Sequence, residues 1–520
     1  MMKKIFNILL LAGTLFTSIS CTKLDEKVYS TITPDKLSGK DLVYQLAPIY
    51  GQYRWLLEYQ SLWDMSEQST DAWVTPTNAD GGWYDGGKWQ RLHQHTWTAY
   101  DPHMESIWNA LYYGVSTCNR VIYQIQSNGG LTADDEKIVS EIKVARAYYY
   151  YQLCSLYGNV PIVDKFDQPE NYLPATNTRA QVLNFIVTDL RANMDNLSDA
   201  PNFGRFNKWS AKHLLAKAYQ NSQAWIGVDK TDSCLIQCND IIASGKYSLD
   251  ASYAHVFSLS NSTSPEVILA FPNDEKNGVP ICWPCYIQTR HGLNGPSFNA
   301  SSPGFNGLRA GPSFVDTYDE SDKRRANNFA QGQQYNLSTG APIMSTDGST
   351  PLIYTKNISS FTSAGEFDGY RFSKYEIKIG QKTETDQDWV AFRYGETLMM
   401  KAECLLRKGD YQGAAEIVNQ VRARSFDASV PDAVKIITAA QLSANAVVDG
   451  VSVPDGVFLN ELGREFAGEM LRREQLLRWG LFNKGTWSFF IPTNDDNLNI
   501  YPIPQTQLQA NNKLVQNPGY

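Results

Sequence analysis

The sequence predicts a mainly α-helical protein in which helical hairpins stack into an array and carry an irregular, loop-rich portion with short strands. Apolar residues recur at helical spacing in several pairs of segments, each pair about 40 residues or longer. Two long stretches between these pairs are instead dense in Gly, Pro, Asn, Ser and Thr. With 42% hydrophobic and 19% charged residues, the chain has a globular rather than a disordered composition.

Residues 1–20 have the pattern of a secretory signal peptide. Lys3 and Lys4 precede an apolar stretch that is too short and too polar for a stable membrane span. The segment ends in Ser20-Cys21, and a Cys after a small residue at this point looks like a bacterial lipoprotein cleavage site. We therefore expect a lipid on Cys21 and a polar tether over residues 21–40, with attachment to the membrane only through acyl chains. The alternative is a plain secretory signal with an unmodified Cys.

The first helical part of the scaffold is expected over residues 104–245, after an amphipathic and also helical segment at 42–62. Thr132 with Asp135 is typical of a capped helix start, and Thr178 is expected to cap the following helix. The helices predicted in this part cover residues 104–126, 134–157, 179–194, 209–224 and 232–243.

The second helical part, residues 390–480, contains the clearest hairpin, at residues 392–426. Two apolar stripes flank a turn at Gly409-Asp410, and their spacing resembles a tetratricopeptide repeat, although an ordinary core hairpin would show the same pattern. A further helix is predicted at 459–479, with Glu465, Glu469 and Arg473 interpreted as its solvated face.

The loop-rich portions are predicted at about 65–103 and 247–389, with short strands at 267–271 and 351–354. Of the 13 tryptophans, seven lie between Trp55 and Trp108, and a second aromatic cluster reaches Phe298 and Phe305. Flat rings with polar neighbours suit sugar rings, whose C–H faces are apolar and whose hydroxyls need partners at the edge. The alternative is that these rings fasten long loops to the body. The candidate glycan-binding residues are Trp73, Trp83, Tyr84, Trp89, Trp97, Trp283, Tyr286 and Arg290.

Several classes of function are not supported by the sequence. The net charge of −8, lowered further when a segment with Lys3 and Lys4 is removed, argues against nucleic acid as a partner. No phosphate-binding loop, dinucleotide fingerprint or hydrolase motif is found, so we expect no catalysis, cofactor or metal. Cys282 and Cys285 lack the flanking strand and helix of a redox site and are interpreted as a structural disulfide or two free thiols.

The chain resembles the SusD/RagB family of outer-membrane nutrient-binding lipoproteins. The resemblance is carried by the lipoprotein-like Cys21, the helices described above, the hairpin and the C-terminal segment YPIPQTQLQANNKLVQNPGY. It implies one SusD-like domain over residues 41–520, with tetratricopeptide-like helix pairs in a right-handed superhelix. It further implies a non-catalytic protein at the cell surface, anchored to the outer membrane. Such a protein captures an oligosaccharide or polysaccharide and delivers it to a SusC-like TonB-dependent transporter. The alternative is a scaffold or peptide-binding subunit of such a complex.

Overall fold

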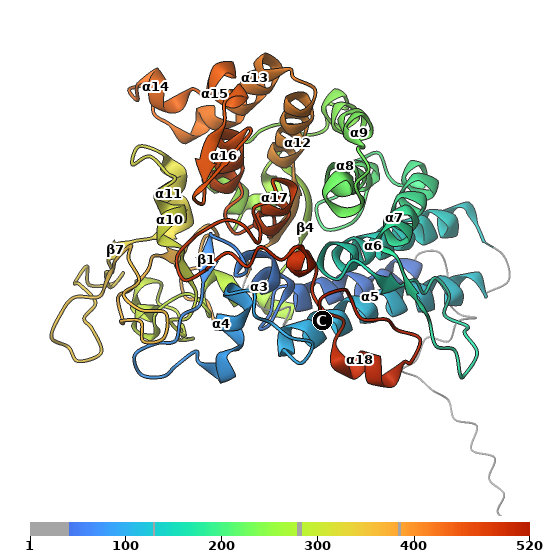
Figure 1. Ribbon diagram of the computed structural model, residues 1–520, viewed down its shortest axis with the longest axis horizontal. Coiled ribbons are helices and arrows are strands. Elements are labelled where there is room, and N and C mark those ends of the chain that lie inside the picture. Colours follow the sequence, from blue (N-terminus) through green and yellow to red (C-terminus); the bar gives the residue numbers. More distant parts are fainter. Residues whose placement is uncertain (1–40, 128–130, 278–282, 383–385) are drawn as a thin grey trace, which may run out of the picture.

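A computed structural model describes residues 41–127, 131–277, 283–382 and 386–520. The predicted signal peptide, Cys21 and the tether lie outside these residues. Figure 1 shows the long helices gathered on two sides of the molecule and the loop-rich segments on a third. Within the described ranges, no helix combines the length and the apolar character that a membrane span needs.

The helices pack against one another in chain order, as the prediction of a repeat array requires. Helix α5 packs on α6, α6 on α7, α7 on α8 and α8 on α9, after which α12 packs on α9 and α13 on α12. The array therefore continues across the loop-rich segment that separates α9 from α12 (Figure 1). The main helices are α5 (Pro102–Gln126), α6 (Ala133–Leu156), α7 (Arg179–Asn193), α8 (Lys208–Ile226), α9 (Thr231–Ala243), α12 (Tyr394–Arg407), α13 (Tyr411–Arg422), α16 (Gly456–Glu465) and α17 (Arg472–Arg478).

The predicted helix boundaries in this array are confirmed. Thr132 and Thr178 each accept a hydrogen bond from the backbone three residues later, which starts α6 and α7 with capping boxes. The turn between α12 and α13 contains Gly409 at φ +80°, and Asp410 caps α13 through Gly413 N.

The prediction of a single helix at 459–479 is wrong, because the chain leaves the helical conformation between α16 and α17. Gly468 and Met470 have φ values of +72° and +63°, which no helix accommodates. The solvated face assigned to Glu465, Glu469 and Arg473 is also wrong, since all three side chains are buried. Apolar spacing could not reveal this, because the residues that bury and pair these charges come from distant segments.

The helix predicted at 42–62 is replaced by short 3₁₀ and α-helical turns. Gln60 has a φ of +59°, and Ser61 begins a new capped helix, so the apolar pattern does not continue as one element. The predicted loop at 65–103 also holds the end of α3 and all of α4. The short helices are α2 (Ala47–Tyr50), α3 (Leu62–Glu67), α4 (Lys88–His93), α10 (Pro312–Val315), α11 (Lys323–Asn328), α14 (Asp432–Lys435), α15 (Ala439–Ser443) and α18 (Gln505–Ala510).

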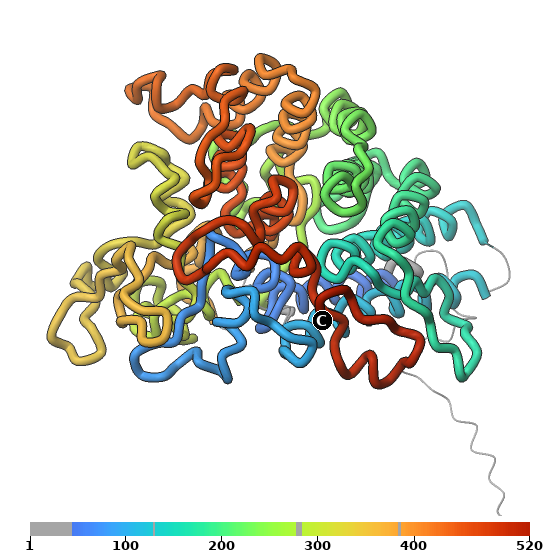
Figure 2. The backbone as a smooth tube through the Cα atoms, viewed as in Figure 1, coloured from blue at the N-terminus to red at the C-terminus, as the bar shows by residue number. Residues whose placement is uncertain are grey.

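Two-stranded sheets hold the loop-rich segments in place, and both predicted strand regions are confirmed. β4 (Val267–Phe271) pairs antiparallel with β10 (Trp389–Arg393), so the second loop-rich segment leaves and re-enters the helical part through adjacent strands. β1 (Trp73–Val74) pairs with β5 (Arg309–Ala310) and joins the first loop-rich segment to the second (Figure 2). The other pairs are β2 (Val160–Pro161) with β3 (Thr176–Asn177), β6 (Phe329–Ala330) with β9 (Arg371–Phe372), β7 (Gly332–Gln333) with β8 (Ile353–Tyr354), and β11 (Ala446–Val448) with β12 (Val451–Val453).

A buried ion network connects the sheets to the helices. Glu465, at the end of α16, lies 2.9 Å from Arg393 Nη1, 2.8 Å from Arg324 Nη1 and 3.0 Å from Arg424 Nη2. Arg393, at the end of β10, also pairs with Glu266 at 2.8 Å and with Glu469 at 2.7 Å. Burial alone would raise the pKa of Glu465, but the three guanidinium groups outweigh it and hold the pKa at about 2.

This network predicts a large effect for Arg393→Met, which leaves three buried carboxylates without one of their cations. Breaking a buried ion pair by removing one partner costs about 3–5 kcal/mol, so we expect the free energy of unfolding to fall by that amount. Urea denaturation followed by circular dichroism measures the change. Lys137→Met, at an exposed pair with Asp134, is the control and should cost under about 1 kcal/mol. A loss at Arg393 as small as at Lys137 would contradict a supporting role for the network.

Candidate functional site

Five aromatic residues from separate loop segments meet at the surface of the loop-rich portion. We name Tyr59, Trp83, Tyr84, Trp283 and Phe305 the aromatic platform. The rings of Tyr59 and Trp283 have centroids 5.5 Å apart, and those of Trp283 and Phe305 lie 5.9 Å apart. Tyr59, Tyr84 and Phe305 are 40%, 59% and 50% exposed, so their rings are available to a ligand.

Backbone geometry fixes the position of Trp83 within the aromatic platform. Its indole Nε1 donates to the carbonyl of Phe305 at 2.5 Å, which joins the first loop-rich segment to the second. A Cβ at Gly307 would lie 2.3 Å from the Trp83 ring, so the ring and the loop backbone touch only because residue 307 is glycine. A similar link holds Trp283, whose backbone N donates to Leu57 O at 3.3 Å.

Polar groups lie at the edge of the aromatic platform. Asp85 Oδ2 accepts from Tyr59 OH at 3.0 Å and from Trp89 Nε1 at 2.9 Å. Lys88 Nζ lies 3.4 Å from the same carboxylate and donates to Tyr59 OH at 2.5 Å. Partial burial opposes ionisation of Asp85, but these hydrogen bonds and the Lys88 charge lower its pKa. The site therefore offers exposed rings beside a partly exposed carboxylate, which the buried Lys88 helps to hold in place.

Of the eight residues predicted to bind glycan, five are buried and three reach the surface. Trp83 and Trp283 are half-buried and Tyr84 is exposed, and these three belong to the aromatic platform. The buried aromatic candidates expose little ring surface, and the buried Arg290 lines a cavity, so none of the five belongs to the aromatic platform. They are Trp73, Trp89, Trp97, Tyr286 and Arg290.

The contacts of the buried tryptophans show what they fasten. Trp73 packs in the core against Phe372 and Phe329, with ring centroids 5.1 and 5.7 Å away. Trp97 donates through Nε1 to the hydroxyl of the C-terminal Tyr520 at 2.7 Å. Trp89 lies beneath the aromatic platform, where its ring contacts those of Tyr59 and Trp83 at 5.6 and 5.4 Å.

The sequence does not mark Tyr59 as a site residue, because Tyr59 lies in a segment whose apolar spacing predicts an amphipathic helix. Its proximity to Trp283 depends on the tertiary fold, and no local pattern signals it.

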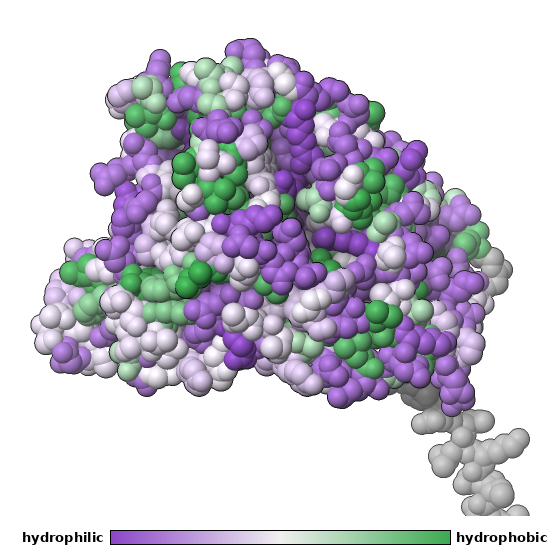
Figure 3. Space-filling view, viewed as in Figure 1, coloured by the Kyte–Doolittle hydropathy of each residue, from purple (hydrophilic) through white to green (hydrophobic). Residues whose placement is uncertain are grey.

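The interpretation of Cys285 as half of a structural disulfide is supported, since its sulfur is disulfide-bonded, although Cys282 lies outside the described residues. The face shown in Figure 3 is mainly hydrophilic, with hydrophobic residues in separate groups.

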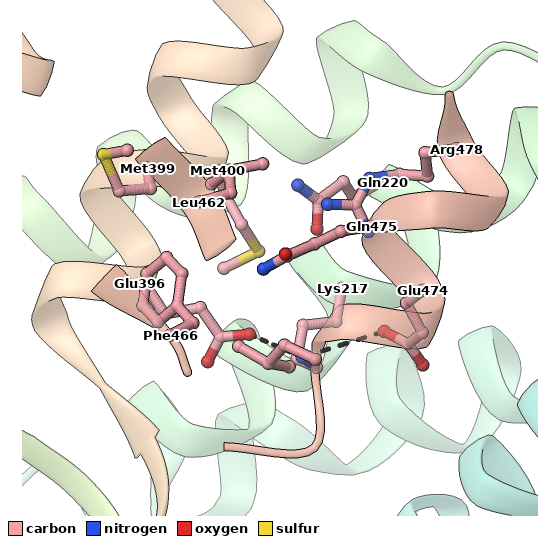
Figure 4. A pocket seen from close by; sticks show the side chains of 11 residues that line it. Lys217, Gln220, Glu396, Met399, Met400, Leu462, Phe466, Glu474, Gln475 and Arg478 are labelled. Carbon is pink, nitrogen blue, oxygen red and sulfur yellow. Dashed lines mark hydrogen bonds and ion pairs between the residues drawn. The ribbon is translucent and has the colours of Figure 1, made fainter. Parts of the chain in front are cut away.

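A charged cavity between α8, α12 and α17 is too small for a ligand (Figure 4). Lys217 Nζ lies 2.5 Å from Glu396 Oε1 and 4.0 Å from Glu474 Oε2, and His213 Nε2 lies 2.8 Å from Glu396 Oε2. The cavity has a volume of about 20 Å³, enough for roughly one water molecule. These groups satisfy one another inside the helical array and do not form a binding site.

Two family models together match nearly the whole chain. Residues 244–520 match the model described as the SusD family. Residues 24–220 match a second model, described as starch-binding associating with outer membrane.

Individual relatives resemble the chain over most of its length. SusD-like protein P25 from Formosa agariphila is 24% identical over 79% of each chain. The starch-binding protein SusD from Bacteroides thetaiotaomicron is 22% identical over 89% of this chain and 86% of its own. Among solved structures, the surface glycan-binding protein A from Bacteroides thetaiotaomicron in complex with laminarihexaose superposes with a TM-score of 0.68. It is 19% identical and covers 92% of this chain and 99% of its own. A SusD superfamily protein from Parabacteroides distasonis gives a TM-score of 0.71 at 18% identity, covering 93% and 100% of the two chains.

The division between buried and exposed aromatics predicts opposite effects on stability. Trp73→Ala should lower the free energy of unfolding by about 3–5 kcal/mol, because it leaves a cavity in the core. Tyr84→Ala should change it by less than about 0.5 kcal/mol, because the ring is exposed. Thermal and urea denaturation of the two variants give the comparison. Equal losses would show that Tyr84 is part of the core packing.

Proposed function

The chain belongs to the SusD family, and we propose that it is a non-catalytic glycan-binding protein of the cell surface that captures an oligosaccharide on the aromatic platform. The observation that carries this proposal is the set of exposed rings held by backbone contacts beside Asp85 and Lys88. Trp83, Tyr84 and Trp283 are the predicted candidates that belong to the aromatic platform, and Tyr59 and Phe305 complete the set. Prior ordering of these rings supports binding, because little side-chain entropy remains to be lost when a ligand docks.

The chemistry of the aromatic platform suits a sugar better than a peptide or a hydrophobic small molecule. Ring faces can cover the apolar C–H side of a pyranose, while the partly exposed Asp85 carboxylate at the edge can accept hydrogen bonds from its hydroxyls. The names of the relatives agree with this assignment, since one is called starch-binding and another was solved with laminarihexaose.

A glycan-binding measurement tests the proposal. Calorimetry with laminarihexaose, maltooligosaccharides and acidic oligosaccharides should identify a ligand for the native protein. Tyr84→Ala and Trp283→Ala should each weaken its binding roughly tenfold, because each removes a ring that stacks on the ligand.

Tyr113→Ala is the matched control, because Tyr113 is 59% exposed on helix α5 in the helical array. This variant should bind as the native protein does. Binding unaffected by any change in the aromatic platform would place the site elsewhere. Retention of peptides but of no glycan would favour a peptide-binding or scaffold subunit instead.

We further propose that a lipid on Cys21 anchors the protein to the outer membrane and that its partner is a SusC-like TonB-dependent transporter. The sequence around Cys21 and the family model associated with the outer membrane support this part. In the native host, the tagged protein should fractionate with outer membranes and co-purify with such a transporter. Cys21→Ser should release it from the membrane fraction. Recovery of the Cys21→Ser protein in membranes, or purification without a transporter, would contradict the corresponding part.

A further inference from the structure

The buried arginines of the molecule differ in whether carboxylates surround them. In the ion network, Arg324 and Arg393 each contact at least three carboxylates. In the loop-rich portion, Arg290, Arg309 and Arg371 are equally buried, at 2%, 0% and 0% exposure. Within the described part of the chain, none of these three forms an ion pair. A buried guanidinium without a counter-ion is costly, so this arrangement calls for a compensating group.

Arg290 has the fewest partners of the three. Its Nη2 donates to Ser373 Oγ at 3.0 Å, while Nε is buried and has no hydrogen-bond partner among the described residues. The guanidinium carbon lies 5.4 Å from the centre of the Phe298 ring. Burial lowers the pKa of Arg290, and the groups that oppose this are two tyrosines rather than a carboxylate. Donor capacity therefore remains for an external acceptor.

Arg309 and Arg371 place further positive charge nearby. Arg371 Nη2 donates to Asn306 Oδ1 at 2.5 Å, and Arg309 Nη2 donates to Asn78 Oδ1 at 2.5 Å. These neutral amides orient the two guanidinium groups. Burial is the main cause that lowers the pKa of Arg309 and of Arg371. The charge of Arg371 adds to the shift at Arg309, and the charge of Arg290 adds to the shift at Arg371, while the Asp368 carboxylate opposes both shifts.

Arg290 lines a cavity that we name the arginine cavity. Its volume is about 390 Å³, within the range of small-ligand sites. Exposed Ala326 and Gln331 stand at the rim, so the cavity opens to solvent. The walls also carry Phe298, Tyr375, Gln334, Ser373 and Glu376. Among the described residues Glu376 forms no ion pair with Arg290, and its Oε2 accepts a hydrogen bond from Leu259 N at 2.9 Å.

The arginine cavity lies close to the aromatic platform. Trp283 of the platform and Phe298 of the cavity wall pack against the same small buried cluster of Tyr286, Ile287 and Ile377. This shared cluster places the arginine cavity and the aromatic platform in the same part of the loop-rich portion.

We propose that the arginine cavity binds an oxyanion carried by the captured saccharide, a uronate carboxylate or a sulfate ester, so that the protein is selective for acidic glycans. This inference rests on the proposed function and adds the class of ligand. A planar guanidinium suits either oxyanion, since its N–H groups can donate in parallel to two oxygens. The anion would supply the counter-charge that the protein itself leaves out around Arg290.

The test compares matched acidic and neutral ligands. Calorimetry would use uronate oligosaccharides and their carboxyl-reduced counterparts, and sulfated oligosaccharides with their desulfated counterparts. The native protein should bind at least one acidic member about tenfold more tightly than its neutral form. The pair that shows the preference identifies the oxyanion. Arg290→Gln should abolish the preference while leaving binding of the neutral form unchanged, and Arg290→Lys should restore part of it.

Two further variants separate binding from folding. Arg179→Gln is the control for loss of a guanidinium group. Like Arg290, Arg179 forms no ion pair within the described residues, but it lies in the helical array, where it donates to Cys154 O and Ser155 O. This variant should keep the preference. Ala326→Trp adds bulk at the exposed edge of the cavity and leaves the Arg290 side chain in the protein. This variant should also lose the preference, so the proposal can be tested even if Arg290→Gln does not fold. Equal affinity for acidic and neutral ligands would overturn this inference and leave the proposed function standing. Failure to bind any glycan would overturn the proposed function itself.

Discussion

The three-way pairing of Glu465 is the interaction on which the rest of the structure depends. One carboxylate is shared by Arg324 from the loop-rich portion, Arg393 from β10 and Arg424 after α13. Buried charges are stable only when their partners are placed accurately, so this cluster forms only when helices, strands and loops have all reached their final positions. It can therefore specify one relative placement of the two parts of the molecule, which apolar packing alone defines less sharply. The loop-rich segments take their position from this placement.

The helical array was largely predictable because its signals are local. Caps such as Thr132 and Thr178 and the turn at Gly409 act within a few residues, and the structure confirms each. The failures occurred where long-range contacts override the local pattern. Glu465 and Glu469 were assigned to a solvated face because a charged residue on a helix is normally exposed, and their arginine partners are distant in sequence. The break between α16 and α17 depends on the positive φ at Met470. The presence of a methionine in the sequence does not predict a positive φ.

The candidate site was predictable as a region but not as a set of residues. Composition identified the two loop-rich segments, and β1, β5 and the Trp83–Phe305 hydrogen bond bring these segments together. Composition does not distinguish Trp73, which faces the core, from Trp83, which faces the surface, because an aromatic side chain suits either position. The distinction arises from tertiary packing, as does the contribution of Tyr59. In such loops, a large share of the rings is needed as internal support before any ring can be presented to a ligand.

The pairing of β4 with β10 has a consequence for how the loop-rich segment can vary. Because both ends of the segment are fixed side by side, its exposed turns can be lengthened or shortened without moving the helices, provided that buried partners of the helical part such as Arg324 are kept. The entropic cost of closing a loop rises only slowly with its length, by about 0.6 kcal/mol for each doubling. The fold thus combines a constant helical frame with a loop-rich segment whose exposed turns can vary in length and sequence.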